Sequence, residues 1–158
     1  ARNIGFNTAS GDILARCDAD SILPPNWIKK IKEDFYKDKI DGLTGPVIFY
    51  DLPFKTPFYS ILYMKLIRII QNGEILIGPN MAISKKIWQK IKNNVCLDEK
   101  KIHEDIDLSL HINDIGGKIK YDWQLIAFIS GRRIKKKPHS FFVEYPILLI
   151  KNIYFHKK

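Results

Sequence analysis

The segment that decides the fold reads Gly11-Asp12-Ile13-Leu14-Ala15-Arg16-Cys17-Asp18-Ala19-Asp20. Its apolar part, from Ile13 to Cys17, predicts a short strand of the kind that is buried on both faces of a parallel sheet. Cys17 is expected to be a small core residue of that strand. Asp18 and Asp20 follow where the strand leaves the sheet, which is where open α/β sheets bind ligands. A ligand site is therefore expected directly after this strand.

Helical and extended patterns alternate along the rest of the chain. Helices are expected to end near residue 10 and to span about 26–39, 58–70, 84–93, 103–115 and 145–155, and further strands are expected at 43–50, 81–83 and 118–123. The apolar residues Ile28, Ile31 and Phe35 predict the buried face of the first complete helix, and Leu108, Ile112 and Ile115 that of the helix at 103–115. The helix at 58–70 is apolar on several sides, which is typical of a buried helix or one that rests on a partner or a bilayer. This alternation predicts an α/β fold.

Composition and charge narrow the class of protein. The chain has 158 residues, of which 46% are hydrophobic and 27% charged, a composition typical of one globular domain. Its net charge is +9, but residues 1–130 carry 18 basic and 16 acidic side chains, whereas residues 131–158 carry eight basic side chains and one acidic. A local basic segment favours contact with phosphates or an anionic membrane surface. It argues against a nucleic-acid-binding protein, which would be basic over a whole face.

The cysteines and the absence of long apolar segments bear on where in the cell the protein is expected. Two cysteines, Cys17 and Cys96, form neither a disulfide framework nor a metal motif, so a reducing, cytoplasmic location is expected. Neither a membrane span nor a signal peptide is expected. The chain begins with Ala1 rather than methionine, and we expect it to be part of a longer protein.

Two acidic clusters are candidates for chemistry. Asp18 and Asp20 offer hard oxygen ligands to Mg²⁺ or Mn²⁺, which can bridge to substrate phosphates; a polar turn is the structural alternative. Residues 103–107 place several carboxylates in the first turn of a helix, where they either favour the helix dipole or supply a general base.

The basic run at 132–137 and the histidines are weaker candidates. The run is expected to be a flexible loop that either faces solvent or binds a diphosphate or lipid headgroups. His111 is expected at the surface of a helix, and His139 is a poor candidate for a metal ligand.

Four motifs in order resemble a family 2 glycosyltransferase of the GT-A fold. They are Ala1–Gly5 with Ala9–Asp12, Asp18–Asp20 followed by Pro24–Trp27, Gly78–Ala82, and Glu104–Leu110 closed by Gly116 and Gly117. The resemblance runs from residue 1 to about residue 133. It implies a Rossmann-like, nucleotide-diphospho-sugar transferase fold with a mixed central sheet, apparently lacking its N-terminal strands. Residues 1–138 would form the C-terminal part of this core, and residues 139–158 a basic, amphipathic tail that contacts a membrane or a partner.

The resemblance also implies a role for each matching residue. Asp20 would bind the divalent metal on the donor diphosphate, and Asp18 would contact the metal, the donor ribose or both. Asp105 would be the catalytic base, supported by Glu104 at the acceptor edge. The remaining residues would contact the donor: Arg2 and Asn3 near the nucleotide, Gly78 and Asn80 beneath the sugar, and Arg132 and Arg133 over the diphosphate. This assignment requires the turn at 18–20 and the helix start near residue 104 to face one another across a shared pocket.

The sequence thus predicts a metal-dependent, inverting glycosyltransferase that moves a sugar from a nucleotide-diphosphate donor to a hydroxyl of a glycan or lipid-linked acceptor. Association with the inner face of a membrane is expected from the apolar helix and the basic end of the chain. The alternative is a catalytically inactive binding or assembly module of the same fold.

Overall fold

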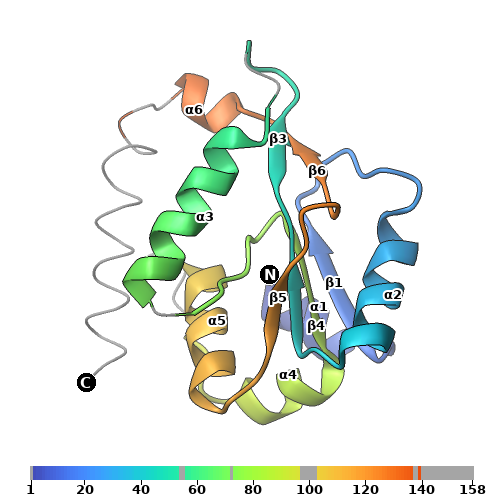
Figure 1. Ribbon diagram of the computed structural model, residues 1–158. Coiled ribbons are helices and arrows are strands. Elements are labelled where there is room, and N and C mark those ends of the chain that lie inside the picture. The colour runs from blue at the N-terminus through green and yellow to red at the C-terminus, as the bar shows by residue number, and fades with distance from the viewer. Residues whose placement is uncertain (1, 54–55, 72, 97–102, 137–138, 140–158) are drawn as a thin grey trace.

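The computed structural model describes residues 2–53, 56–71, 73–96, 103–136 and 139 (Figure 1). Helices and strands are interspersed along the chain, which gives the α/β class that the sequence predicts. In chain order they are α1 (Arg2–Thr8), β1 (Ile13–Cys17), α2 (Trp27–Asp38), β2 (Gly42–Thr44), β3 (Val47–Phe49), α3 (Phe58–Gln71), β4 (Asn80–Ser84), α4 (Lys85–Ile91), α5 (Glu104–Asp114), β5 (Ile119–Tyr121), β6 (Ala127–Ile129) and α6 (Arg132–Lys136). The predicted helix at 145–155 and nearly all of the predicted tail at 139–158 lie outside the described residues.

The central sheet is mixed, which confirms the expected architecture. Among the described residues it has the strand order β1-β4-β2-β5, in which β4 runs antiparallel to both β1 and β2, and β2 runs parallel to β5. A second, smaller sheet pairs β3 with β6 in parallel. The central strand β4 is buried on both faces, because Met81, Ala82 and Ile83 are all fully inaccessible.

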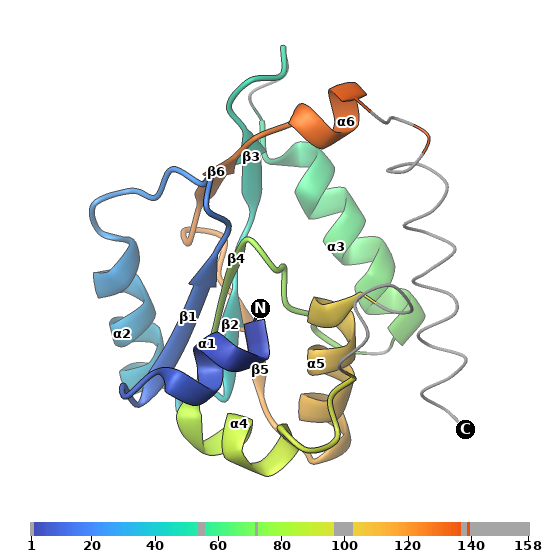
Figure 2. The same ribbon diagram turned by 180° about the vertical axis from the view of Figure 1, so that it is seen from behind.

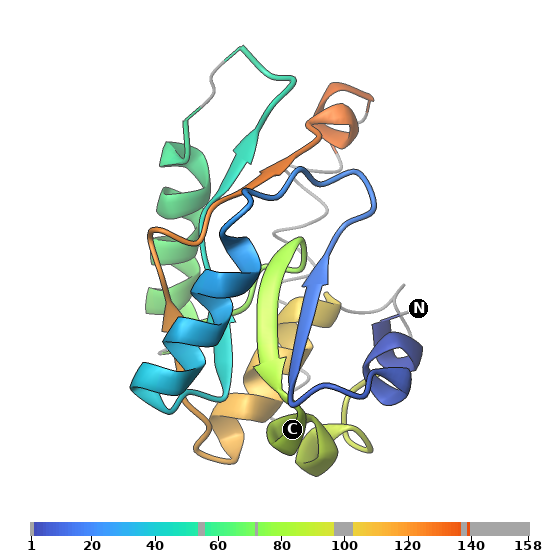
Figure 3. The same cartoon turned by 90° about the vertical axis from the view of Figure 1, so that its right-hand side faces the viewer.

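Two hydrophobic clusters cover the two faces of this sheet. Leu14, Met81 and Ile83 pack with residues of α1, α4 and α5 on one face, and Leu43 and Ala82 pack with residues of α2 on the other. Figure 3 shows α2 in front of the sheet, and Figure 2 shows α2 and α5 on opposite sides of it. A third cluster joins Met64 and Ile67 of α3 to Ile106 of α5. The strand β1, through Leu14, and the helix α5, through Leu108, are thus held in one packed cluster.

The prediction that β1 is buried on both faces is wrong. It is the edge strand of the described sheet, and only Leu14 of its five residues is buried. Cys17 is exposed and is not a core residue. A short apolar run does not distinguish an edge strand from a central one, because hydrophobicity does not report how many neighbours pair with the strand.

The strand expected at 43–50 is divided into β2 and β3. Pro46 lacks an amide hydrogen for a continuous ladder, and a Cβ atom at Gly45 would overlap the carbonyl oxygen of Leu125. The chain changes direction here, so that β3 leaves the main sheet and pairs with β6, a strand that the sequence analysis missed.

Smaller corrections concern the helices. Ile28 and Ile115, predicted on buried faces, are 53% and 46% exposed. In α2 the prediction is confirmed for Ile31, and the other buried positions are Trp27 and Asp34. Residues 132–136, expected to form a flexible loop, form the short helix α6. Within the described part of the chain, no helix is long and apolar enough to span a bilayer.

Candidate functional site

The two aspartates after β1 are accessible side chains on a turn. The amide of Ser21 donates to the carbonyl of Asp18, which closes the turn. The side chains of Asp18 and Asp20 are 46% and 44% exposed. Each lies near one guanidinium, that of Arg16 at 3.9 Å and that of Arg132 at 3.4 Å respectively. These contacts are loose enough to leave carboxylate oxygens for another ligand.

The first turn of α5 carries the second acidic group. The helix begins after His103, and Glu104, Asp105 and Asp107 lie in its first turn. Asp105 accepts a hydrogen bond at 3.0 Å from the amide of Gly78 through Oδ2, and its carbonyl accepts one at 2.6 Å from the hydroxyl of Ser109. The loop before β4 therefore fixes the direction of the Asp105 carboxylate.

Asp107 has a different role from its two acidic neighbours. It is buried and accepts a hydrogen bond at 2.9 Å from the amide of Cys96. The imidazole Nε2 of His111, one turn later, lies 3.6 Å from its other oxygen. Asp107 thus joins Cys96, at the described end of the segment after α4, to α5, and the half-buried His111 lies beside it on the same helix.

Arg16 connects the two acidic groups, and the sequence analysis missed it. Its Nη1 atom lies 3.0 Å from Oε2 of Glu104, and its Nη2 atom lies 3.9 Å from Oδ1 of Asp18. The turn after β1 and the start of α5 therefore lie close together, while a pocket shared by the two stays a prediction. The sequence does hold a signal for Arg16. Side chains two residues apart on an extended chain point to the same side, so Arg16 is expected on the same side as Asp18.

Arg2 and Asn3 lie at the start of α5. The Arg2 guanidinium is buried, donates to the carbonyl of Glu104, and donates through Nε to Oδ1 of Asn3 at 2.9 Å. Burial lowers the pKa of Arg2, against the opposing effect of Glu104. In this structure both residues support the helix start, and their predicted contact with the nucleotide stays a prediction.

Gly78 and Asn80 belong to the same loop but face different surroundings. A Cβ atom at Gly78 would lie 3.3 Å from Oδ2 of Asp105, so the glycine allows the backbone to approach the carboxylate closely. The Asn80 side chain is fully buried, accepts from Nε1 of Trp27 at 2.8 Å and donates to the carbonyls of Pro46 and Leu125. This side chain is turned into the core, and its hydrogen bonds assign it a structural role.

Arg132, in the basic segment at the end of the described chain, lies beside Asp20. Nη2 of Arg132 lies 3.4 Å from Oδ2 of Asp20, and Arg133 is exposed on the same short helix. Asp51 holds α6 in place, because its carboxylate accepts from the amide of Gly131 at 2.5 Å and from the hydroxyl of Ser130 at 2.9 Å. The amide of Gly131, followed by the smaller effects of Ser130 and Lys135, lowers the pKa of Asp51.

The chemistry of the donor set suits a hard divalent cation at Asp18 and Asp20. In the described ranges, no group of three or more His, Cys, Asp or Glu side chains is arranged to hold a metal ion. A cation bound by these two carboxylates would thus need further oxygen ligands from water or from a bound phosphate, which is the usual coordination of Mg²⁺ in proteins.

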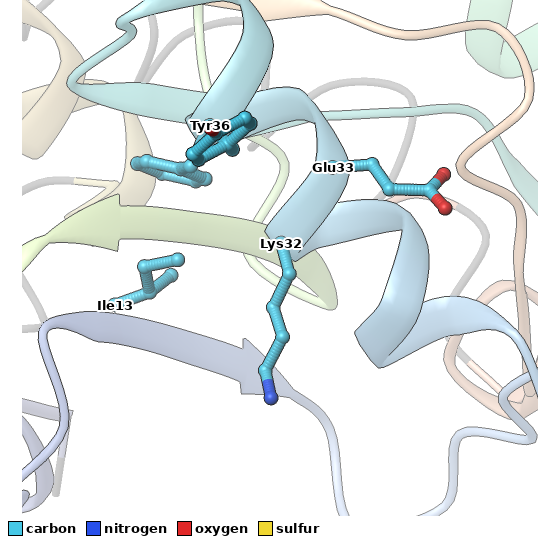
Figure 4. Close-up of a pocket in the computed structure, with 5 residues that line it drawn as sticks. Ile13, Lys32, Glu33 and Tyr36 are labelled. Atoms are coloured by element: carbon cyan, nitrogen blue, oxygen red, sulfur yellow. The ribbon is translucent and has the colours of Figure 1, made fainter.

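A shallow hollow elsewhere on the molecule is separate from these residues. It lies where α2 packs over β1 and is lined by Ile13, Lys32, Glu33, Phe35 and Tyr36 (Figure 4). None of the predicted site residues lines this hollow. Its mostly apolar walls do not suit a charged nucleotide sugar.

Comparisons with known proteins agree with this architecture. The model of the family described as "Glycosyl transferase family 2" matches residues 1–96. The structure also resembles that of the mannosyltransferase PcManGT from Pyrobaculum calidifontis, solved in complex with GDP-Man and Mn²⁺, with a TM-score of 0.69 and 14% sequence identity. The match covers 96% of this chain but 41% of that one, so the present chain spans about two fifths of its length. No curated protein sequence matches the chain. The likeness to PcManGT establishes a GT-A type of fold, and the family model, which matches more than half of the chain, shows that it belongs to glycosyl transferase family 2.

Proposed function

We propose that this chain is part of the catalytic domain of a metal-dependent, inverting glycosyltransferase. The donor is a nucleotide-diphosphate sugar, and the acceptor is a hydroxyl group of a glycan or a lipid-linked molecule. Family membership supports sugar transfer, and the GDP-Man and Mn²⁺ in the related structure support this class of donor and cofactor.

One observation carries the proposal. Arg16 lies between Asp18 and Glu104, at 3.9 and 3.0 Å, and so brings the acids after β1 beside the first turn of α5. Sugar transfer with inversion needs stabilisation of the leaving diphosphate on one side of the sugar and a base for the acceptor hydroxyl on the other. The two acidic groups offer these two functions within one region.

Asp18 and Asp20 are the residues that would hold Mg²⁺ or Mn²⁺. When bound, the cation would neutralise charge on the diphosphate. Arg132, 3.4 Å from Asp20, lies where its guanidinium could also contact the diphosphate, together with Arg133 on the same helix.

Asp105 is the proposed general base, with Glu104 beside it. The amide of Gly78 directs the Asp105 carboxylate by donating to Oδ2, while Oδ1 accepts the amide of Ile106. An acceptor hydroxyl within hydrogen-bond distance of this carboxylate would give up its proton there as its oxygen attacks the anomeric carbon. The bond between that carbon and the diphosphate oxygen would break in the same step, and the nucleotide diphosphate would leave.

The proposal is tested by donor binding. We expect calorimetric titration of nucleotide sugars to give heat only when Mn²⁺ is present, and we expect Asp20→Ala to remove this metal-dependent binding. Asp12→Ala is the matched control, because Asp12 is an exposed aspartate at the opposite end of β1, about 20 Å along the extended chain. A folded protein that binds no nucleotide sugar would instead favour the alternative, an inactive binding or assembly module.

We also propose that α3 rests on an anionic membrane at the cytoplasmic face. Phe58, Leu62 and Ile69 are 59%, 55% and 79% exposed and follow the spacing of one helical stripe. Lys65 belongs to the same stripe and lies over the ring of the exposed Trp123. Apolar side chains interleaved with a cation are typical of helices that lie in the membrane interface.

Flotation with liposomes tests this surface. Ile69→Glu is expected to reduce binding to vesicles that contain anionic lipid, and high salt is expected to do the same. Tyr36→Glu is the control, since Tyr36 is 91% exposed on α2, a helix on another part of the molecule. Equal flotation of the parent and both variants would contradict membrane association through α3.

A further inference from the structure

Arg16 is a charged side chain between the two acidic groups, and none of the proposed chemical steps uses it. Its contact with Glu104 is close, at 3.0 Å, whereas its contact with Asp18 is longer, at 3.9 Å. The side chains of Arg16 and Glu104 are 28% and 20% exposed. The Arg16–Glu104 bond is therefore partly shielded from water and is stronger than a pair on the open surface.

The loop before β4 restricts where this guanidinium can lie. A Cβ atom at Gly78 would be 3.7 Å from both Cζ and Nη1 of Arg16, which is ordinary van der Waals contact. The amide of the same glycine donates to Asp105 at 3.0 Å. One residue, Gly78, thus separates the Arg16 guanidinium from the carboxylate of Asp105.

Arg2 and Arg16 hold different parts of Glu104. Arg2 donates to its backbone carbonyl, and Arg16 donates to its carboxylate. Arg2 belongs to α1, whereas Arg16 belongs to the strand that leads directly into Asp18 and Asp20. Of these two contacts, the one from Arg16 connects the start of α5 to the strand that carries the donor-side acids.

We propose that Arg16 is a positioning residue for sugar transfer: by holding Glu104, it sets the first turn of α5, and with it Asp105, at a fixed place relative to Asp18 and Asp20. This inference rests on the proposed function, because it concerns the placement of its base. It predicts that Arg16 affects the rate of the chemical step more than the binding of the donor. The reason is that Asp18 and Asp20 remain on their own turn when the Arg16 contact is lost.

Steady-state kinetics of the full-length protein test the inference. We expect Arg16→Gln to lower kcat by about 10- to 100-fold, the effect of a displacement of about 1 Å at a reacting group, with little change in KM for the donor. Arg16→Lys keeps a cation that can reach the Glu104 carboxylate, so its kcat should lie between those of the parent and of Arg16→Gln. Glu104→Gln, which removes the charge from the other side of the bond, should lower kcat by a similar factor.

Arg68→Gln is the matched control. Arg68 makes an ion pair of the same kind, 2.8 Å from Glu74, on α3, a helix that carries none of the proposed site residues. Its kcat should equal that of the parent. If Arg16 were only a structural residue, Arg16→Gln would lower the melting temperature while kcat per folded molecule stayed unchanged, and that result would overturn the inference.

The remaining outcomes separate the two proposals. A parent protein that transfers no sugar from any donor overturns the proposed function itself. An active parent whose Arg16→Gln variant keeps its kcat, or loses only donor affinity, overturns the role of Arg16 alone. If Arg16→Gln does not fold, Arg16→Lys gives the same comparison.

Discussion

Residues of the same type at the start of α5 have different roles because their partners differ. Asp107 is buried and accepts a backbone amide, whereas Asp105 is partly accessible and is directed by the loop at Gly78. Glu104 is held by two arginines. A cluster of acids in a first helical turn therefore contains both residues that hold the fold and a residue that can act on a substrate.

Asp105→Asn is predicted to lower kcat by about 10²- to 10⁴-fold, because an amide cannot accept the proton of the acceptor hydroxyl. Donor binding in the presence of Mn²⁺ should be unchanged, since the base acts in the transition state and an asparagine oxygen can still accept from Gly78. Parallel measurements of kcat and of donor affinity check this prediction. Asp107→Asn, the control on the same helix, should alter stability but not kcat per folded molecule.

At the scale of elements, a network of charges fastens α2 to β5 and the residue after it. Nζ of Lys120 lies 2.9 Å from Oδ1 of Asp34 and 2.5 Å from Oδ2 of Asp38. Lys30 lies 3.0 Å from Asp122 and 3.9 Å from Asp34. Asp34 is buried, so its charge depends on these two ammonium groups.

Lys120→Met is predicted to lower the free energy of unfolding by about 2 kcal/mol, a value between that of an exposed pair and that of a buried one, because Asp34 loses its closest cation. Urea unfolding followed by circular dichroism measures the change. Lys29→Met is the control, since Lys29 lies 3.8 Å from Glu33 on the exposed side of the same helix and should change stability by less than about 0.5 kcal/mol. Equal effects of the two substitutions would contradict a role for the network in holding α2.

The sequence predicted the elements whose signals are local. A helix was predicted from residue 84, and the hydroxyl of Ser84 accepts from the amide of Ile87 at the start of α4; Gly116 follows α5 with a positive φ of 71°. The limits of β1 were also predicted correctly, as Ile13–Cys17. These features depend on residues within a few positions of one another.

The errors concern pairing between distant segments. Whether β1 is central or an edge strand depends on its neighbours, and the break between β2 and β3 depends on the approach of Leu125, about 80 residues away, to Gly45. The same holds for the site. Asp18 and Glu104 were predicted from their motifs, but Arg16, which lies between them, and the burial of Asn80 depend on contacts formed only in the folded chain.

At the scale of the whole molecule, the charge of this strongly basic chain depends on the pKa values of its carboxyl groups. The net charge is +9, with 17 acidic residues. Hydrogen bonding from Lys120 lowers the pKa of Asp38, and the amide of Gly131 lowers that of Asp51. Burial opposes ionisation of Asp122, but the Gln124 amide and Lys30 outweigh it and lower the pKa of that carboxyl. Burial raises the pKa of Asp34.

The signs of these shifts predict acid-induced loss of stability. A carboxyl whose pKa is lower in the folded state stabilises the fold above its unfolded value near 3.9, and this contribution is lost as the pH falls through the folded value. Asp34 acts in the opposite direction, since its contribution is present at low pH and is lost as the pH rises. Three carboxyls have a lowered pKa and one has a raised pKa. The free energy of unfolding is therefore expected to fall as the pH decreases from about 5 to about 3.

Protonation of the acids also increases the positive charge of the whole chain, so repulsion among its 26 basic side chains adds to the effect. Urea titrations at several pH values should therefore show a midpoint that falls on acidification, and about 1 M NaCl, where the Debye length is about 3 Å, should restore part of it. Lys120→Met should lose less stability on acidification than the parent, because Asp38 then titrates near its ordinary pKa in both states. A midpoint that rises at low pH would mean that the buried Asp34, rather than the three ionised carboxylates, governs the response of this fold to acid.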